Sequence, residues 1–256
     1  MAYSPEQLEQ LYAEQQDWLD RGQDLSCSLV TRNWRSAKGN EYGRHGLARR
    51  LADLDHSARR IFEVLPPDVQ QPTRFALREA TVFLHSFVIN CFGAIDNAAH
   101  IWVSEAGITA ANGRELSKSR IGFSTHDKHD RVLASLPPLL RDQILAMTDW
   151  QDYLANYRHA LAHRIPPYIP PRRWTDRDAD RHAALEVDIG QALRARDFDT
   201  CDVLRAEQDR LGQFWPVMMH SYGERAQPML MHPQIVCDLA TVVELGTGLI
   251  AGLDGL

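Results

Sequence analysis

The chain has 256 residues, 44% of them hydrophobic, which is enough to bury a sizeable core in one large domain or in a domain with an appended region. Its formal net charge of −6 excludes a general nucleic-acid coat protein, so any contact with RNA must be local. We expect a cytoplasmic protein with free thiols and no membrane contact, because the four cysteines form no C-x-x-C pair, no signal peptide is recognisable, and no uncharged run is long enough to cross a bilayer.

Two helices are predicted in residues 1–70. Ser4-Pro5-Glu6-Gln7 has the pattern of a helix start, with a serine cap, a proline at the first position and a glutamine at the third. Residues 23–40 lose the apolar periodicity and are expected to form a loop. A second helix is predicted from about Gly46 to Leu65, where Pro66-Pro67 ends it. We expect these residues to form an N-terminal helical region appended to the rest.

The longest predicted helix runs from Arg74 to about Glu105. It is apolar on more than one face, which is typical of the central helix of a bundle. Asn90 and Asn97 share one face with a glycine between them that admits a close neighbour, and Asp96 and His100 are an i, i+4 pair. These polar groups either satisfy one another in the core, or Asp96 or Asn97 faces a later helix and orients its histidine.

A second amphipathic helix is predicted from a cap at Thr148 to Arg164, where Pro166-Pro167 ends it. Its apolar face follows helical spacing: Trp150, Tyr153, Leu154, Tyr157 and Leu161. Its opposite face carries polar side chains: Asp152, Asn156, His159 and His163. Arg158 lies on the flank between the two faces.

Three interpretations of Arg158, His159 and His163 remain open. Cationic side chains are favoured at helix C-termini, so the three residues can serve the helix alone. The two histidines, spaced i, i+4, can bind a metal, although Ala160 stands where a zincin has its glutamate. The three can also form one phosphate-handling site, because arginine clamps a phosphodiester and histidine moves protons near neutral pH.

A proline-rich stretch and six arginines between positions 158 and 181 follow this helix or overlap its end. An aromatic residue among arginines suits a single-stranded RNA surface, although Trp174 is equally well explained as a packed loop anchor. The predicted nucleic-acid-binding residues are Arg164, Arg172, Arg173 and Trp174. Residues 178–212 are predicted to be helical with a break near 197–199, and the last helix begins at His232-Pro233.

Arg158-His159-Ala160-Leu161-Ala162-His163 resembles the motif of HEPN domains, in which an arginine precedes a polar residue and then, after a short spacer, a histidine. The continuation into residues 165–171 resembles a largely uncharacterised bacterial branch of that superfamily. The resemblance covers roughly residues 73–252 and does not explain residues 1–70.

This resemblance implies a metal-independent endoribonuclease without a cofactor, of the kind found in toxin–antitoxin or defence systems. Arg158 would hold the scissile phosphate, His163 would be the general acid or base, and His159 would assist. Supporting polar residues are expected in the motif helix and in its partner helix: Asn156, Asp152, Asp96 and Asn97. The implied partners are RNA, a second copy of the chain, and an antitoxin or other partner protein.

The predicted fold is all-α. We expect an up-and-down bundle in residues 73–256, built from the long central helix, the motif helix and two C-terminal helices, with the N-terminal pair packed across it. The alternative function is a non-catalytic HEPN-like module that binds RNA or a nucleotide, or that serves as a protein scaffold. A metal-dependent hydrolase comes third.

Overall fold

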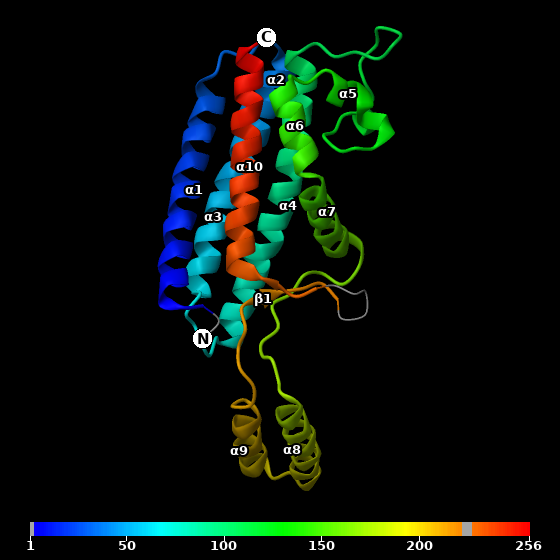
Figure 1. Cartoon of the computed structure of the whole chain (residues 1–256). Helices are drawn as coiled ribbons and strands as arrows, with labels where there is room; N and C mark the ends of the chain where they lie inside the picture. The colour runs from blue at the N-terminus through cyan, green and yellow to red at the C-terminus, as the bar shows by residue number, and fades with distance from the viewer. Residues whose placement is uncertain (1–2, 222–226) are drawn as a thin grey trace.

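The computed structural model describes residues 3–221 and 227–256, and four long helices form its body (Figure 1). These helices are α1 (Pro5–Thr31), α3 (Ala48–Val64), α4 (Arg74–Glu105) and α10 (Met231–Asp254). They pack around one core in the order α1, α3, α4, α10, with α10 returning to α1. The all-α prediction is confirmed, because β1 (Val217–Met218) and β2 (Met229–Leu230) are the only strands among the described residues.

The remaining helices are shorter and connect or decorate this bundle. They are α2 (Ala37–Asn40), the π-helix η1 (Glu41–Leu47), η2 (Lys118–Arg120), η3 (Asp127–His129), α5 (Asp130–Ala134), α6 (Pro138–Ala146), α7 (Thr148–His163), α8 (Asp176–Ala195) and α9 (Phe198–Gln208). The predicted ranges of the long central helix and of the motif helix therefore agree with α4 and α7.

The N-terminal region differs from the expectation in two respects. The predicted loop over residues 23–40 is wrong at both ends, since α1 continues to Thr31 and residues 37–40 form α2. Leu25 and Leu29 extend the buried stripe of this helix, and burial against the bundle favours helix even where polar residues dilute the pattern. In addition, α1 and α3 supply two of the four bundle helices, so residues 5–64 share the main core and are not packed across it.

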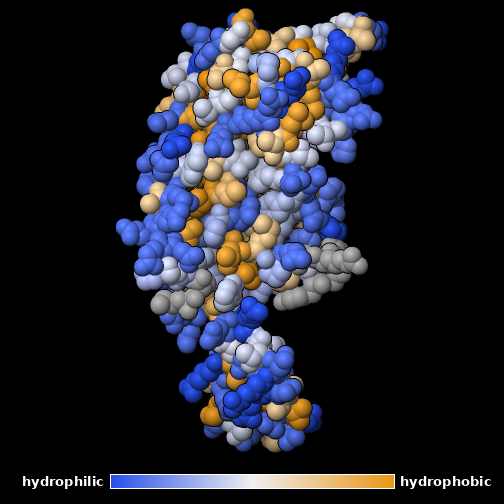
Figure 2. Space-filling model, viewed as in Figure 1, coloured by the Kyte–Doolittle hydropathy of each residue, from blue (hydrophilic) through white to orange (hydrophobic). Residues whose placement is uncertain are grey.

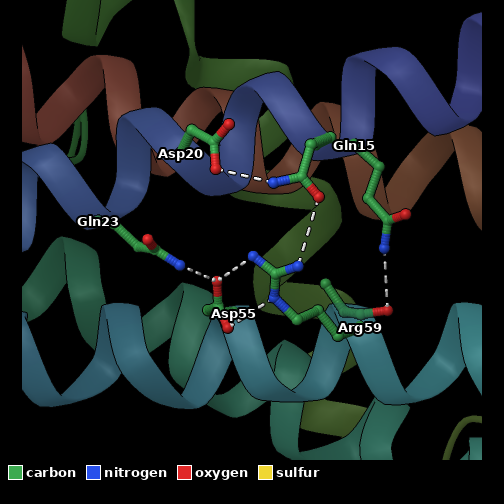
Figure 3. A network of polar contacts seen from close by, with 7 residues as sticks. Gln15, Asp20, Gln23, Asp55 and Arg59 are labelled. Carbon is green, nitrogen blue, oxygen red and sulfur yellow. Dashed lines mark hydrogen bonds and ion pairs between the residues drawn. The ribbon is translucent and has the colours of Figure 1, made fainter.

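Polar side chains complete the contact between α1 and α3 on its solvent side (Figure 3). Arg59 donates two hydrogen bonds to Asp55, at 3.0 and 3.2 Å, and a third to Gln16 at 3.4 Å. Gln23 also reaches Asp55, at 3.3 Å. Arg59 and Asp55 are half-buried, and contacts of this kind near a surface each stabilise little, so the apolar core supplies most of the free energy.

α4 and α10 are the most apolar helices. By length and composition each could cross a membrane, but 61% of the apolar window of α4 and 50% of that of α10 is buried inside the bundle. Trp102, Phe87 and Leu84 of α4 and Leu249 of α10 are completely or almost completely buried. Such burial shows that both helices contribute to the core of the bundle.

α8 and α9 form a helical hairpin that projects from one end of the bundle (Figure 1). The predicted break near 197–199 is confirmed, because α8 ends at Ala195 and α9 begins at Phe198. The expectation that both C-terminal helical segments belong to the bundle is wrong for this one. Its own apolar cluster is small, with Ile189, Ala192 and Cys201 buried, and does not merge with the main core.

The connections into and out of the hairpin run antiparallel and form a stem. Tyr168 pairs with Met219, and Arg173 pairs with Gln213, through backbone hydrogen bonds of 2.7–3.1 Å. β1 and β2 then lead into α10. The stem therefore begins directly after the last turn of α7 and carries the chain to the hairpin.

Candidate functional site

α7 lies beside α4 and follows α6 in the chain. Leu154, Tyr157 and Ala160 are its buried residues, as the predicted apolar face requires. The predicted cap is wrong, because the N-cap position is Met147, and the Thr148 hydroxyl instead donates to the Leu145 carbonyl at 2.8 Å. The buried face fixes which side chains of α7 remain available to a ligand.

A buried carboxylate anchors the first turn of α7 to α10. Trp150 Nε1 donates to Asp238 Oδ1 at 2.8 Å, and Gln234 donates to the same oxygen at 2.6 Å. Burial raises the pKa of Asp238 to about 7, against the lowering effect of these hydrogen bonds. Burial, and next the charge of Asp238, raise the pKa of Tyr153 well above its ordinary value. The anchor holds α7 against the bundle but lies two to three turns from the motif.

The polar face of α7 is held near its end by the stem. Asn156 Nδ2 donates to His220 Nε2 at 3.1 Å, and Arg164 donates to the Asn156 carbonyl and side-chain oxygens at 2.9 and 2.6 Å. The His220 ring also meets Tyr157 edge-on, with ring centroids 5.2 Å apart. Asn156 is therefore a structural tie between the motif helix and residues around β1. His220 was not predicted, because nothing in its own segment marks it.

Arg158 projects toward α4. Its guanidinium lies over the Phe92 ring, 5.3 Å from the centroid. Asp96 lies one turn further along α4, where desolvation raises its pKa and the charges of Arg50 and Arg158 oppose that rise. The structure thus brings Asp96 into electrostatic range of the motif arginine, and the expectation that Asp96 orients the motif histidine stays a prediction.

Asn97 does not face the motif helix, so the expectation that Asn97 orients the histidine of that helix is wrong. Arg50 of α3 donates to Asn97 at 3.3 Å and to Asn90 at 3.1 Å. The close neighbour that Gly93 admits is this same arginine, since a Cβ at Gly93 would collide with its guanidinium. Successive residues of a helix point about 100° apart, so Asp96 and Asn97 face different neighbours. The expected pairing of His100 with Asp96 is replaced by stacking of His100 on Tyr42, with ring centroids 4.4 Å apart.

His159 and His163 both face solvent in the last two turns of α7. Their ring centroids are 5.7 Å apart and their planes are tilted by 46°. Asp152 is also exposed and lies one turn before Asn156. The helix C-terminus favours positive charge near His163. The structure therefore places Arg158 against α4 and leaves the two imidazoles together and accessible.

The predicted nucleic-acid-binding residues divide between two places. Arg164 folds back on α7 through Asn156, as described above. Arg172 donates to the Leu211 carbonyl at 2.9 Å, and the guanidinium of Arg173 lies 5.7 Å from the Trp215 ring centroid. Trp174 packs against His182 of α8, with ring centroids 4.2 Å apart and planes tilted by 34°. Only the last three belong to one surface.

That surface is a cleft of about 1420 Å³ between the end of the bundle and the base of the hairpin, which we call the neck cleft. Residues 67–74 form one wall, and residues 170–176 and 212–217 form much of the other. His85 Nε2 donates to the Pro167 carbonyl at 2.6 Å and ties the path between α7 and the cleft to α4. His85, like His220, was not predicted, because its partner is distant in sequence.

The described residues contain no cluster of three or more histidine, cysteine, aspartate or glutamate side chains with the spacing of a metal site. His159 and His163 stand as a pair without a third such side chain beside them in that part of the chain. No family model matches this chain, and no curated protein or solved structure matches it either.

Proposed function

We propose that the chain is a metal-independent endoribonuclease whose site is the last two turns of α7. The observation that carries this proposal is that the residues of α7 that pack in the core differ from those that carry reactive groups. Leu154, Tyr157 and Ala160 make the core contacts of the helix, whereas Arg158, His159 and His163 do not. An arginine steadied by an aromatic ring and two accessible imidazoles, 5.7 Å apart, are the groups that phosphodiester cleavage needs.

The reaction uses the ribose as the nucleophile. His163 removes the proton of the 2′-hydroxyl, and the 2′-oxygen forms a bond to phosphorus. The bond from phosphorus to the 5′-oxygen breaks, and His159 gives that leaving oxygen a proton. Arg158 binds the phosphate oxygens as their negative charge grows. The products are a 2′,3′-cyclic phosphate and a 5′-hydroxyl, so the step consumes no water.

One observation favours a non-catalytic module as the second candidate. Asp96 lies within electrostatic range of Arg158, and its negative charge repels a phosphate at the same place. In that case the surface of α7 would bind RNA, a nucleotide or a protein without cleaving anything. Cleavage assays separate the two candidates, because only the first predicts that wild-type protein gives a cleaved product.

We also propose that the chain acts as a homodimer in the cytoplasm, under the control of an antitoxin or other partner protein. Support for the dimer comes from an exposed stripe on α4. Phe75, Val82 and Ile89 are spaced seven residues apart and are 74%, 59% and 40% exposed. A seven-residue repeat is the pattern with which one helix packs along another. Because Arg78 and Asp96 lie at opposite ends of the same face, an antiparallel pair would match opposite charges.

The test of the function is cleavage of a mixed RNA pool by wild-type protein and by the Arg158→Ala and His163→Ala variants, with and without EDTA. We expect wild type to cut in EDTA and each variant to lose roughly 10²-fold or more of the rate. His45→Ala is the matched control, because His45 is an equally exposed histidine on η1. Equal cutting by wild type and both motif variants would overturn the proposal.

A further inference from the structure

The neck cleft is a large concavity that the proposed reaction does not use. The cleft lies at the far end of the segment that leaves α7. An RNA strand bound at α7 can therefore continue along the stem into the cleft. Figure 2 shows the narrowing between the body and the hairpin where this region lies. Large clefts with a few convergent polar groups are the usual form of ligand sites.

An accessible aromatic face is the central feature of the cleft. Trp174 is 45% exposed, although its ring packs against that of His182 with the two planes tilted by 34°. Gly212, at φ +76°, lets the stem pass against the Trp174 edge, where a Cβ would collide with the indole. The ring is therefore held in place by its surroundings and still presents surface to the cleft. An indole fixed in this way is a stacking platform for a planar group.

The charges of the cleft wall exclude a ligand bound chiefly through many phosphates. Its lining contains three arginines and three aspartates, and one of each, Arg74 and Asp209, form an ion pair at 3.5 Å. Arg172 and Arg173 have no carboxylate partner among the described residues, and they adjoin Trp174 in the chain. The cleft therefore provides a nearly neutral interior with two available cations beside the aromatic ring.

Unused amides supply the remaining chemistry. Gln70, Gln71 and Gln213 line the cleft, are exposed, and make no side-chain hydrogen bond within the part of the chain that the structure describes. A carboxamide donates and accepts at once, which matches the edge of a nucleobase. A duplex hides the Watson–Crick edges and both faces of its bases, whereas a single strand can turn a base outward.

We infer that the neck cleft binds an unpaired nucleobase of single-stranded RNA. The base stacks on Trp174, amides from the cleft walls meet its edge, and Arg172 and Arg173 contact the flanking phosphates. The choice of RNA as the ligand rests on the proposed function, whereas the choice of a single strand and of a stacked base rests on the cleft itself. The cleft would hold the substrate at a distance from the scissile phosphate and so contribute to affinity.

The experiment measures anisotropy of a fluorescein-labelled single-stranded RNA of about twelve nucleotides, long enough to stack several bases. His163→Ala protein is used throughout so that the probe stays intact. Adding Trp174→Ala should weaken binding about 5- to 150-fold, the usual effect of losing one base–aromatic stack. Trp174→Phe should restore most of the affinity. Trp18→Ala is the control, because Trp18 is a partly exposed indole outside the cleft, on α1, with Arg21 4.6 Å from its ring centroid.

Equal affinity of the Trp174→Ala and parent proteins, with unchanged melting temperatures, would overturn the inference. Tighter binding of the same sequence as a duplex would also overturn it. So would displacement of the RNA by a proline-rich peptide, because the cleft would then be a peptide site. The result is independent of catalysis. If wild type never cleaves RNA but Trp174→Ala still weakens binding, the proposed function fails and the cleft assignment stands. If cleavage occurs and Trp174→Ala binds normally, the reverse holds.

Discussion

Replacing Asp238 by asparagine should make the protein more stable in mild alkali and remove part of its dependence on pH. Asp238 is buried between α7 and α10, where it accepts hydrogen bonds from Trp150 and Gln234. Asparagine keeps a carbonyl oxygen for both donors and carries no charge at any pH. The substitution therefore removes the cost of burying a carboxylate without removing the anchor of the motif helix.

The magnitude follows from the pKa of the buried carboxyl group. Burial raises the pKa of Asp238 from 3.8 to about 7. Between these values the unfolded chain has released the proton and the folded chain still holds it, so the free energy of unfolding falls as pH rises from about 4 to 7. A difference of about three pKa units corresponds to about 4 kcal/mol. The loss is complete above the folded pKa.

The assay is urea unfolding followed by far-UV circular dichroism at about pH 5 and about pH 8. The change in unfolding free energy between the two pH values is measured for both proteins. Subtracting the change for Asp238→Asn from that for wild type cancels the contributions of the other titrating groups. We expect wild type to lose about 2.5–3 kcal/mol more than the variant between the two pH values, because part of the total loss is already present at pH 5. Asp142→Asn, at an exposed position on α6, is the control and should titrate like wild type. Equal pH dependence of the Asp238→Asn and wild-type proteins would refute the reasoning.

Three further predictions concern other parts of the molecule. Val82→Glu combined with Ile89→Glu should convert a dimer of the 29.1 kDa chain to a monomer in sedimentation, with little change in melting temperature, because both side chains are exposed. Tyr157→Ala should cost about 3–5 kcal/mol of unfolding free energy, whereas His159→Ala should stay within about 0.5 kcal/mol in the same denaturant titration. Burial lowers the pKa of His232 to about 4, so its contribution to stability is present above pH 6.5 and is lost as pH falls toward 4. Wild type should lose about 3 kcal/mol of unfolding free energy from this group on acid titration, and the His232→Gln variant should not.

Helical periodicity sufficed to predict α4 and α7, because both have strong apolar faces and α7 is followed by paired prolines. It failed in the second half of α1. There Ser26, Cys27 and Ser28 separate the buried Leu25 and Leu29, and the stripe is recognisable only when its partner helices are known. Which apolar faces meet is a property of the whole fold, so membership of the bundle could not be read from each helix alone.

The candidate site was predictable to the same extent. The proximity of His159 and His163 follows from their i, i+4 spacing on one helix, whereas the direction of Arg158 toward Phe92 depends on α4. The direction of Asn97 depends on Arg50, which lies 47 residues away in the sequence. Asn156 and its partner His220 are 64 residues apart. Contacts over such separations carry no local signal.

The chemistry of the RNA ends tests the central claim most directly. Wild-type protein in excess EDTA should convert RNA to fragments with 2′,3′-cyclic phosphate and 5′-hydroxyl ends, measured by mass spectrometry. A substrate with a 2′-deoxyribose at the cleaved position should remain intact, because it lacks the attacking oxygen. Arg158→Ala and His163→Ala should give neither product. Fragments with 5′-phosphate ends, cleavage that EDTA abolishes, or the same ends from Arg158→Ala at the wild-type rate would contradict the account.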